Sequence, residues 1–130
     1  MIIKNYNYSE TIFNIDFSDK VNVLDDYSGT GKTFLMSMLS SYCEENNIPY
    51  IYIDYRMKNS ILLNELSNCK VLLFDQADLY MDFNMFEKIK NLNAISIISI
   101  KSTSNLDMSE EVGEYILNND GYVISTKKVG

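Results

Sequence analysis

The hydrophobic pattern of the chain starts with two short strand-like runs and then alternates between strands and helices. Residues 1–4 and 11–17 form the strand-like runs, and the polar segment between them predicts that they pair as an N-terminal hairpin. In the second run Phe13, Ile15 and Phe17 fall on one face, which is typical of a half-buried strand.

From residue 21 onward, apolar runs alternate with stretches of helical periodicity. Leu35, Met38, Leu39 and Tyr42 recur at spacings of three and four, which predicts a helix. The elements predicted after the hairpin are strands at 21–24, 50–53, 70–74, 94–100 and 121–126, and helices at 32–45, 60–66, 83–92 and 109–117. This alternation predicts an α/β fold, a three-layer sandwich with a mostly parallel five-stranded sheet plus the N-terminal β-hairpin.

The length of 130 residues fits a single domain, with the hairpin at 1–18 and the core at 19–130. Apolar residues make up 46% of the chain, which is typical of a globular protein rather than a disordered one. No apolar run approaches the ~20 residues that a membrane span needs, and the first residues do not have the pattern of a signal peptide. We therefore expect a cytoplasmic location and no membrane partner.

Charge and residue usage exclude several classes of function. The net charge is −7, and without a basic face we expect no direct nucleic-acid partner, unless an acidic surface mimics DNA. The absence of histidine excludes histidine-based catalysis and most zinc sites. Cys43 and Cys69 have no metal-ligand spacing and are expected to be buried, reduced thiols. The many Asn, Ile, Tyr and Lys residues indicate an AT-rich genome, such as that of a low-GC bacterium, its phage or a mobile element.

A glycine loop joins the first core strand to the first helix. It reads Asp26-Tyr27-Ser28-Gly29-Thr30-Gly31-Lys32-Thr33. Glycines at such a junction let backbone N–H groups face phosphate oxygens, and the helix N-terminus adds partial positive charge. Lys32 is placed to reach the β- and γ-phosphates, and Thr33 to offer its hydroxyl to Mg²⁺. The loop therefore predicts binding of a nucleoside triphosphate, with ATP and Mg²⁺ as the expected ligands.

This loop resembles the Walker A motif, G-x-x-x-x-G-K-[ST], of the P-loop NTPase superfamily. Gly31, Lys32 and Thr33 match the fixed positions of the motif, whereas Asp26 stands where its first glycine belongs. A carboxylate at that position is expected either to repel the phosphates or to cap N–H groups of the loop itself. The simpler alternative is a glycine loop that only turns a strand into a helix.

A second motif follows the apolar strand at 70–74. Residues 71–78 read VLLFDQAD and resemble the Walker B motif of the same superfamily, which implies that Asp75 holds Mg²⁺. One branch of that superfamily carries a catalytic glutamate where this chain has Gln76, and an amide cannot take a proton from water as a carboxylate can. Asp78 is the alternative base, and the simpler interpretation of Asp75 is a cap on a strand-end turn.

Four further residues are weaker candidates for the same site. Ser99 or Ser102 matches the place of a polar sensor beside the γ-phosphate, although a plain polar loop is the simpler interpretation. Arg56, the only arginine, follows a strand and is a candidate arginine finger, but such residues are usually solvated or paired. Tyr27 is placed either to contact a base or ribose or to cover the loop.

The order of motifs and strands resembles a minimal ATPase core of the additional-strand branch, AAA+-like or ABC-like. The resulting hypothesis is an ATP·Mg²⁺-binding protein with weak or absent hydrolysis, which acts as a nucleotide-dependent interaction module toward a protein partner. One alternative is a small active ATPase that a partner chain completes. The other is a non-enzymatic phage or mobile-element protein that uses its acidic surface on a vestigial nucleotide-binding scaffold.

Overall fold

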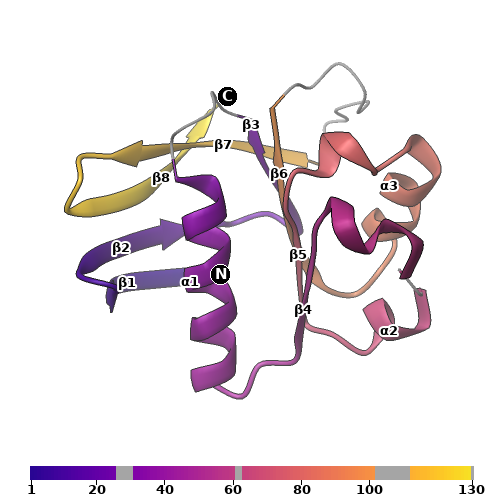
Figure 1. Ribbon diagram of the computed structural model, residues 1–130, viewed down its shortest axis with the longest axis horizontal. Coiled ribbons are helices and arrows are strands. Elements are labelled where there is room, and N and C mark those ends of the chain that lie inside the picture. Colours follow the sequence, from indigo (N-terminus) through magenta and orange to yellow (C-terminus); the bar gives the residue numbers. More distant parts are fainter. Residues whose placement is uncertain (26–30, 61–62, 102–111, 130) are drawn as a thin grey trace.

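The strands form one eight-stranded sheet (Figure 1). The computed structural model describes residues 1–25, 31–60, 63–101 and 112–129. Its strands are β1 (Ile2–Tyr8), β2 (Thr11–Asp16), β3 (Val21–Asp25), β4 (Tyr50–Ile53), β5 (Val71–Phe74), β6 (Ile95–Ile100), β7 (Val112–Asn119) and β8 (Val123–Val129). Its helices are α1 (Lys32–Glu45), α2 (Leu63–Ser67) and α3 (Phe83–Lys90), with single 3-10 turns η1 (Tyr55–Ser60) and η2 (Ala77–Leu79).

The sheet is mixed and curls into a half-barrel. Its strand order is β1-β2-β8-β7-β3-β6-β5-β4. Strands β7, β3, β6, β5 and β4 run parallel to one another, and β2 is parallel to β8. The hairpins β1–β2 and β7–β8 are antiparallel and lie together at one end, where the sheet bends around α1 (Figure 1).

Helix α1 packs against the concave face of the curled sheet. Alternate residues of the central strands, such as Leu24, Leu73 and Ile97, point to this face and belong to one core with Leu35 and Leu39 of the helix. The N-terminal hairpin and the β7–β8 hairpin add their inner faces to the same core. Burial of α1 on three sides follows from this bend, because a flat sheet of these strands would leave part of the helix in water.

The opposite face of the central strands is covered by α2 and α3 (Figure 1). Val23, Phe74 and Ile98 alternate with the residues of the first core and pack with Phe86 and Ile89 of α3. The neighbouring strands β3, β5 and β6 are therefore apolar on both faces, as strands covered on both sides must be.

The predicted fold class is wrong. The sheet is eight-stranded and mixed, instead of a mostly parallel five-stranded sheet within a three-layer sandwich, and the predicted N-terminal hairpin is part of that sheet. The main error lies at 109–117, which was predicted as a helix although Val112–Asn119 is strand β7. Alternate residues of β7, from Gly113 to Leu117, are buried, so the pattern has the period of a strand and creates the second antiparallel hairpin.

Most of the other predicted elements are confirmed, and one is wrong in its extent. The helix at 32–45 and the strand at 50–53 are confirmed with the same bounds, and the remaining predicted strands and the helix at 83–92 are confirmed within a few residues. The predicted helix at 60–66 is wrong in its extent, because η1 occupies Tyr55–Ser60 and α2 begins at Leu63. Cys43 is buried and Cys69 half-buried, both without a disulfide. Among the described residues, no helix is both long and apolar enough to cross a bilayer.

A partly exposed polar cluster joins the curled end of the sheet to the segment just before β3. The Tyr115 hydroxyl donates to Asp19 Oδ2 over 2.7 Å, and Lys128 Nζ lies 2.9 Å from the same oxygen. Gly113 faces this carboxylate so closely that an added Cβ would lie 2.0 Å from Asp19 Oδ2. The carboxylate has no room to move away without loss of its two partners.

We expect Gly113→Ala to lower the free energy of unfolding by about 1–3 kcal/mol, as overpacking of an ordered interior does. The check is urea unfolding followed by circular dichroism. Gly121→Asn is the control for loss of a glycine without crowding: nothing lies near its missing Cβ, and the strain of its φ of +94° is mildest for asparagine, so its loss of stability should be the smaller one. Equal stability of the two variants would contradict this account of the cluster.

Candidate functional site

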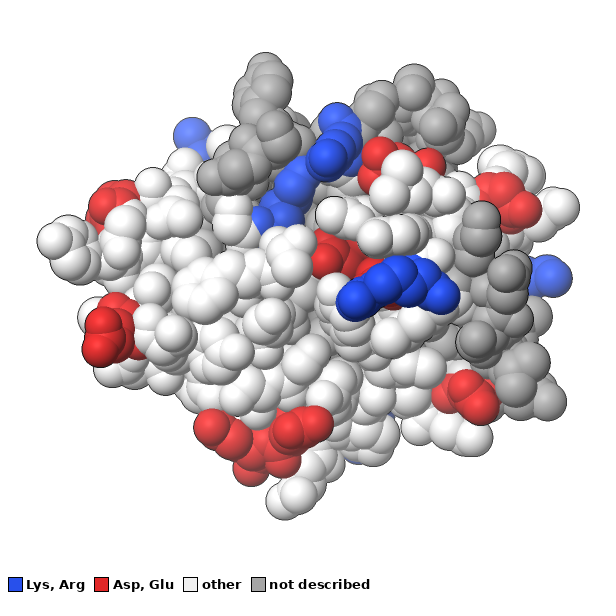
Figure 2. All heavy atoms as spheres, in the orientation of Figure 1, with Lys and Arg blue, Asp and Glu red and all other residues white. Residues whose placement is uncertain are grey.

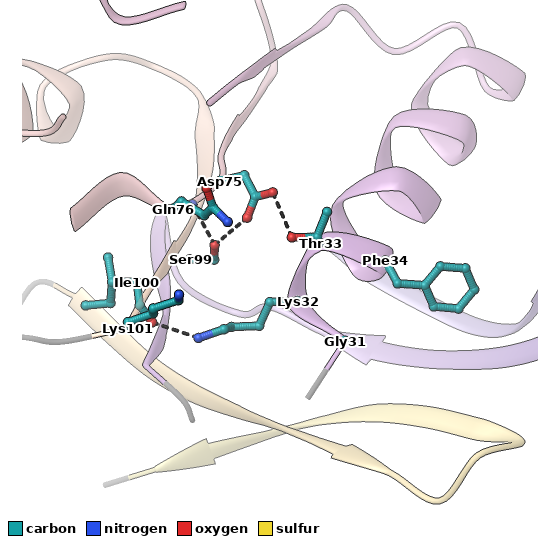
Figure 3. Close-up of a pocket in the computed structure, with 9 residues that line it drawn as sticks. All are labelled: Gly31, Lys32, Thr33, Phe34, Asp75, Gln76, Ser99, Ile100 and Lys101. Carbon is teal, nitrogen blue, oxygen red and sulfur yellow. Dashed lines mark hydrogen bonds between the residues drawn. The ribbon is translucent and has the colours of Figure 1, made fainter. Parts of the chain in front are cut away.

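The residues of the two sequence motifs meet at one edge of the sheet. Strands β3, β5 and β6 are parallel neighbours, so their carboxyl ends lie together, and α1 begins at the same edge. A cavity of about 310 Å³ opens there. It is lined by Gly31, Lys32, Thr33, Phe34, Asp75, Gln76, Ser99, Ile100 and Lys101 (Figure 3).

The N-terminus of α1 forms one wall of the cavity. Gly31 precedes the helix with a φ of +92°, a left-handed conformation that favours glycine. The first N–H groups of a helix have no partner within it, and its dipole favours negative charge at this end. Lys32 adds a full positive charge, and its Nζ donates to the Ile100 carbonyl over 2.9 Å. This wall is therefore suited to an anion.

Asp75 forms the opposite wall and is held by three side chains. Its Oδ2 accepts from the Thr33 hydroxyl at 3.0 Å and from the Tyr52 hydroxyl at 2.9 Å, and its Oδ1 accepts from the Ser99 hydroxyl at 2.7 Å. Asp75 is only 3% exposed, and Ser99 is buried as well. The carboxylate is thus fixed in orientation beside the first turn of α1.

Gln76 continues from Asp75 into the cavity with an unusual backbone. Its φ is 52° and its ψ is 45°, a left-handed conformation that costs a non-glycine residue of order 1 kcal/mol or more. The backbone N–H of Gln76 donates to Ser99 Oγ over 3.0 Å, which stabilises this turn. Ser99 therefore connects Asp75 to the backbone of Gln76 (Figure 3).

Two tyrosines border the Asp75 wall from outside the cavity. Tyr52 reaches Asp75 from β4, and the Tyr80 hydroxyl donates to the Ile53 carbonyl over 3.0 Å. Burial raises the pKa of Tyr52, and its hydrogen bond to the Asp75 carboxylate raises it further. Burial likewise raises the pKa of Tyr80. Both phenols are therefore protonated hydrogen-bond donors at neutral pH.

The structure brings together only part of the predicted site. Gly31, Lys32, Thr33, Asp75 and Gln76 all line the cavity. Ser99, for which a plain loop was the simpler interpretation, lies at its centre (Figure 3). The predicted residues Asp26, Tyr27, Ser28, Gly29, Thr30 and Ser102 lie outside the described residues.

Two other candidates do not line the cavity. Asp78 Oδ1 accepts a long 3.4 Å hydrogen bond from the backbone N–H of Lys101, at an exposed position. Arg56 pairs with Asp54 just after β4, and this guanidinium holds the pKa of the Asp54 carboxyl below its usual range. Arg56 is therefore a paired surface residue in this structure, as the simpler interpretation expected.

Tyr52 is the residue that sequence reasoning missed. Its position on β4 opposite Leu73 of β5 places its side chain beside the end of β5, where Asp75 begins the next turn. The sequence contains this signal only indirectly. Tyr52 is the penultimate residue of β4, and β4 runs parallel to β5, the strand that ends just before Asp75.

The charges around the cavity are mixed. Figure 2 shows basic side chains near the top of this face, close to acidic ones, while further acidic side chains lie along its lower edge and flanks. Lys32 and Lys101 line the cavity together with Asp75. An anion in this cavity would therefore contact cationic groups in spite of the net charge of −7 of the chain.

The oxygen atoms around Asp75 suit Mg²⁺ better than a metal ion that takes all of its ligands from protein side chains. Among the described residues, no three acidic or thiol side chains gather into a metal cage. The oxygens of Thr33 and Asp75 lie 3.0 Å apart, and Mg²⁺ is typically held by one or two carboxylates together with phosphate oxygens and waters. These residues fit a cation that arrives with a phosphorylated ligand.

Comparison with known proteins gave no relative: no family model, no curated protein and no solved structure matches the chain. The assignment to the P-loop NTPase superfamily, with its AAA+-like or ABC-like core, is therefore corrected. It rested on two short motifs, whereas the described fold is a small, mostly strand, curled mixed sheet with three helices. Short motifs report a local strand–loop–helix geometry and the chemistry of a few side chains, which different architectures can carry.

Proposed function

We propose that this protein binds a nucleoside triphosphate together with Mg²⁺ in the cavity at the start of α1. The observation that carries the proposal is the 3.0 Å contact between Thr33 Oγ1 and Asp75 Oδ2, next to Lys32 at a helix N-terminus. A hydroxyl and a carboxylate at this separation suit one small divalent cation, and the lysine and helix end suit the phosphates that it accompanies.

Each side chain has a distinct part in this proposal. The ammonium of Lys32 bonds to the Ile100 carbonyl in this structure and would turn to phosphate oxygens on its flexible four-carbon stem. Thr33 and Asp75 would hold the cation, and Ser99 would keep Asp75 oriented. When bound, Mg²⁺ would neutralise phosphate charge and bridge the phosphates to the protein. ATP is the expected triphosphate.

Hydrolysis is proposed to be weak or absent because the described residues that line the cavity include no suitable proton acceptor. Among the described residues that line it, Asp75 is the only carboxylate, and three hydroxyl groups already occupy it. Gln76 stands beside it with an amide, which cannot take a proton from an attacking water. Loss of a general base costs roughly 10²–10⁴-fold in rate.

A bound nucleotide that is hydrolysed slowly is suited to control an interaction with a protein partner. The turn η2 follows directly on Asp75 and Gln76, and its Leu79 is 59% exposed. Binding of a cation at Asp75 would therefore alter hydrogen bonds close to an exposed apolar side chain. We propose that a partner protein binds at this end of the sheet and distinguishes the ATP-bound protein from the nucleotide-free one.

Calorimetric titration tests the binding of ATP directly. We expect ATP to bind the wild-type protein at least tenfold more tightly with Mg²⁺ than with EDTA, since charge neutralisation and two oxygen ligands act only in the presence of the cation. Thr33→Val removes the hydroxyl at constant shape, and the dependence on Mg²⁺ should fall to less than about threefold as direct coordination is lost.

Ser37→Ala is the matched control for Thr33→Val. Ser37 lies one helical turn further along α1, where its hydroxyl donates to the Thr33 carbonyl, and it does not line the cavity. We expect this variant to bind ATP·Mg²⁺ as the wild type does. Absence of ATP binding to the wild-type protein at millimolar concentration, with or without Mg²⁺, would contradict the proposed function.

A further inference from the structure

The two carboxylate oxygens of Asp75 accept different numbers of hydrogen bonds from the described residues. A carboxylate oxygen accepts about two hydrogen bonds, one at each lone pair. Oδ2 accepts from both Thr33 and Tyr52, whereas among the described residues Oδ1 accepts from Ser99. Oδ2 is therefore filled, and it is also the oxygen that faces the first turn of α1.

A cation at Thr33 and Asp75 requires one of these bonds to open. The Thr33 hydroxyl must turn its proton away from Oδ2 so that its own lone pair can face the cation. The hydroxyl of Tyr52 reaches Oδ2 from β4, a different element from the helix that carries Thr33, so its bond to Oδ2 can persist when the Thr33 hydroxyl turns. Of the two donors to Oδ2, Tyr52 is thus the one that can hold the carboxylate in both states.

We propose that Tyr52 is a positioning residue for the Mg²⁺ site, which fixes Asp75 Oδ2 toward Thr33 by donating its hydroxyl to that oxygen. This inference rests on the proposed function and adds to it a residue that touches neither the phosphates nor the cation. Hydrogen bonds from outside a metal site orient its ligands, and their removal typically lowers metal affinity 10–100-fold.

Strand pairing makes this position rigid. Tyr52 lies opposite Leu73 in the β4–β5 ladder, and the backbone N–H of Asp75 donates to the Ile53 carbonyl over 2.8 Å. The backbones that carry the two side chains are therefore bonded to each other. Without the hydroxyl, only Ser99 and Thr33 would hold the carboxylate, and Thr33 would leave it when the cation binds.

The experiment compares Tyr52→Phe with the wild type by two titrations. The first is ATP binding in EDTA, which reports the fold and the phosphate wall. The second is titration of the ATP-saturated protein with Mn²⁺ as a probe for the Mg²⁺ site, with free Mn²⁺ followed by electron paramagnetic resonance. We expect unchanged metal-free ATP affinity and an increase of about tenfold or more in the Mn²⁺ concentration at half-saturation.

Tyr80→Phe is the matched control, because it removes the same hydroxyl from a neighbouring tyrosine that bonds to the Ile53 carbonyl instead of Asp75. We expect this variant to take up Mn²⁺ as the wild type does. A similar loss in both variants would overturn the proposal in favour of a general effect of buried hydroxyl groups.

The remaining outcomes separate this inference from the proposed function. A wild-type protein that binds neither ATP nor Mn²⁺ with ATP overturns the proposed function and this inference together. A wild type that binds both, with a Tyr52→Phe protein of equal Mn²⁺ affinity, overturns the inference alone. A Tyr52→Phe protein that has also lost metal-free ATP binding overturns it as well, since Tyr52 would then be structural.

Discussion

Replacement of Lys32 by alanine is expected to weaken ATP·Mg²⁺ binding about 100-fold. A hydrogen bond to a charged group contributes about 1.5–3 kcal/mol, and a lysine at a triphosphate adds attraction to neighbouring charges. A loss of about 3 kcal/mol corresponds to roughly 100-fold in the dissociation constant. Calorimetric titration of both proteins in Mg²⁺ measures it directly.

The fold should survive this substitution. Lys32 is half-buried at the first turn of α1, and its ammonium donates to the carbonyl of Ile100, a residue that lines the cavity. Alanine is the best helix former, so α1 keeps its start at this residue. Circular dichroism and thermal unfolding should therefore be close to those of the wild type.

Lys101→Ala is the matched control for Lys32→Ala, because both variants remove one lysine charge from the cavity. Lys101 also lines the cavity but is exposed, so solvent and salt screen its charge. We expect only a few-fold loss of affinity. Equal losses in the two lysine variants would show that the site attracts anions by net charge alone, without a phosphate held at the start of α1.

The helix at 32–45 was predictable because its signals are local. The apolar residues of α1, among them Leu35 and Leu39, recur at helical spacing over many turns, and a glycine stands immediately before the helix. The strand at 70–74 was equally clear because its apolar run is unbroken, and β5 is buried on both faces. Where the immediate neighbourhood decides the structure, the sequence carries enough information.

The curl of the sheet was not predictable from such signals. Ser109 is a typical helix cap and suggested a helix at 109–117, where the structure has strand β7 from Val112 onward. In the structure Tyr115 of this segment bonds to Ser18 and Asp19, about a hundred positions earlier in the chain. Pairing with the next strand, β8, and with the distant strand β3 overrides the local preference, and no single window of the sequence contains the pairing with β3.

The residues of the candidate site were likewise predictable where a local pattern marks them, and they were missed where only strand pairing places them. Asp75 and Thr33 each follow a recognisable local pattern, and the rule that parallel strands end at one edge was sufficient to place them together. Tyr52 was missed because its position depends on β4 being the neighbour of β5 in register. The structure brings the predicted side chains together, while the roles of Lys32, Thr33, Asp75 and Gln76 stay predictions.

Replacement of Gln76 by glutamate is expected to raise ATP turnover by roughly 10²–10⁴-fold, the contribution of a positioned general base. Gln76 lines the cavity next to Asp75, and the Ser99 hydroxyl accepts from its backbone N–H, so the substitution leaves the turn intact. Glutamate has the same shape, and a carboxylate close to Asp75 and to phosphate favours a raised pKa, nearer to that of an effective base. Phosphate release in a single turnover measures the change.

Three further variants decide whether the gain arises from this carboxylate in this cavity. Gln76→Ala should give no gain, since it adds no proton acceptor. Combining Gln76→Glu with Lys32→Ala should abolish the gain, because the triphosphate is no longer held beside the new base. Asp78→Asn should leave the slow wild-type rate unchanged, because Asp78 lies outside the cavity lining. Brisk turnover by the wild-type protein alone would contradict the proposal that bound ATP is kept intact for a partner to read, and it would favour Asp78 or another acceptor as the base.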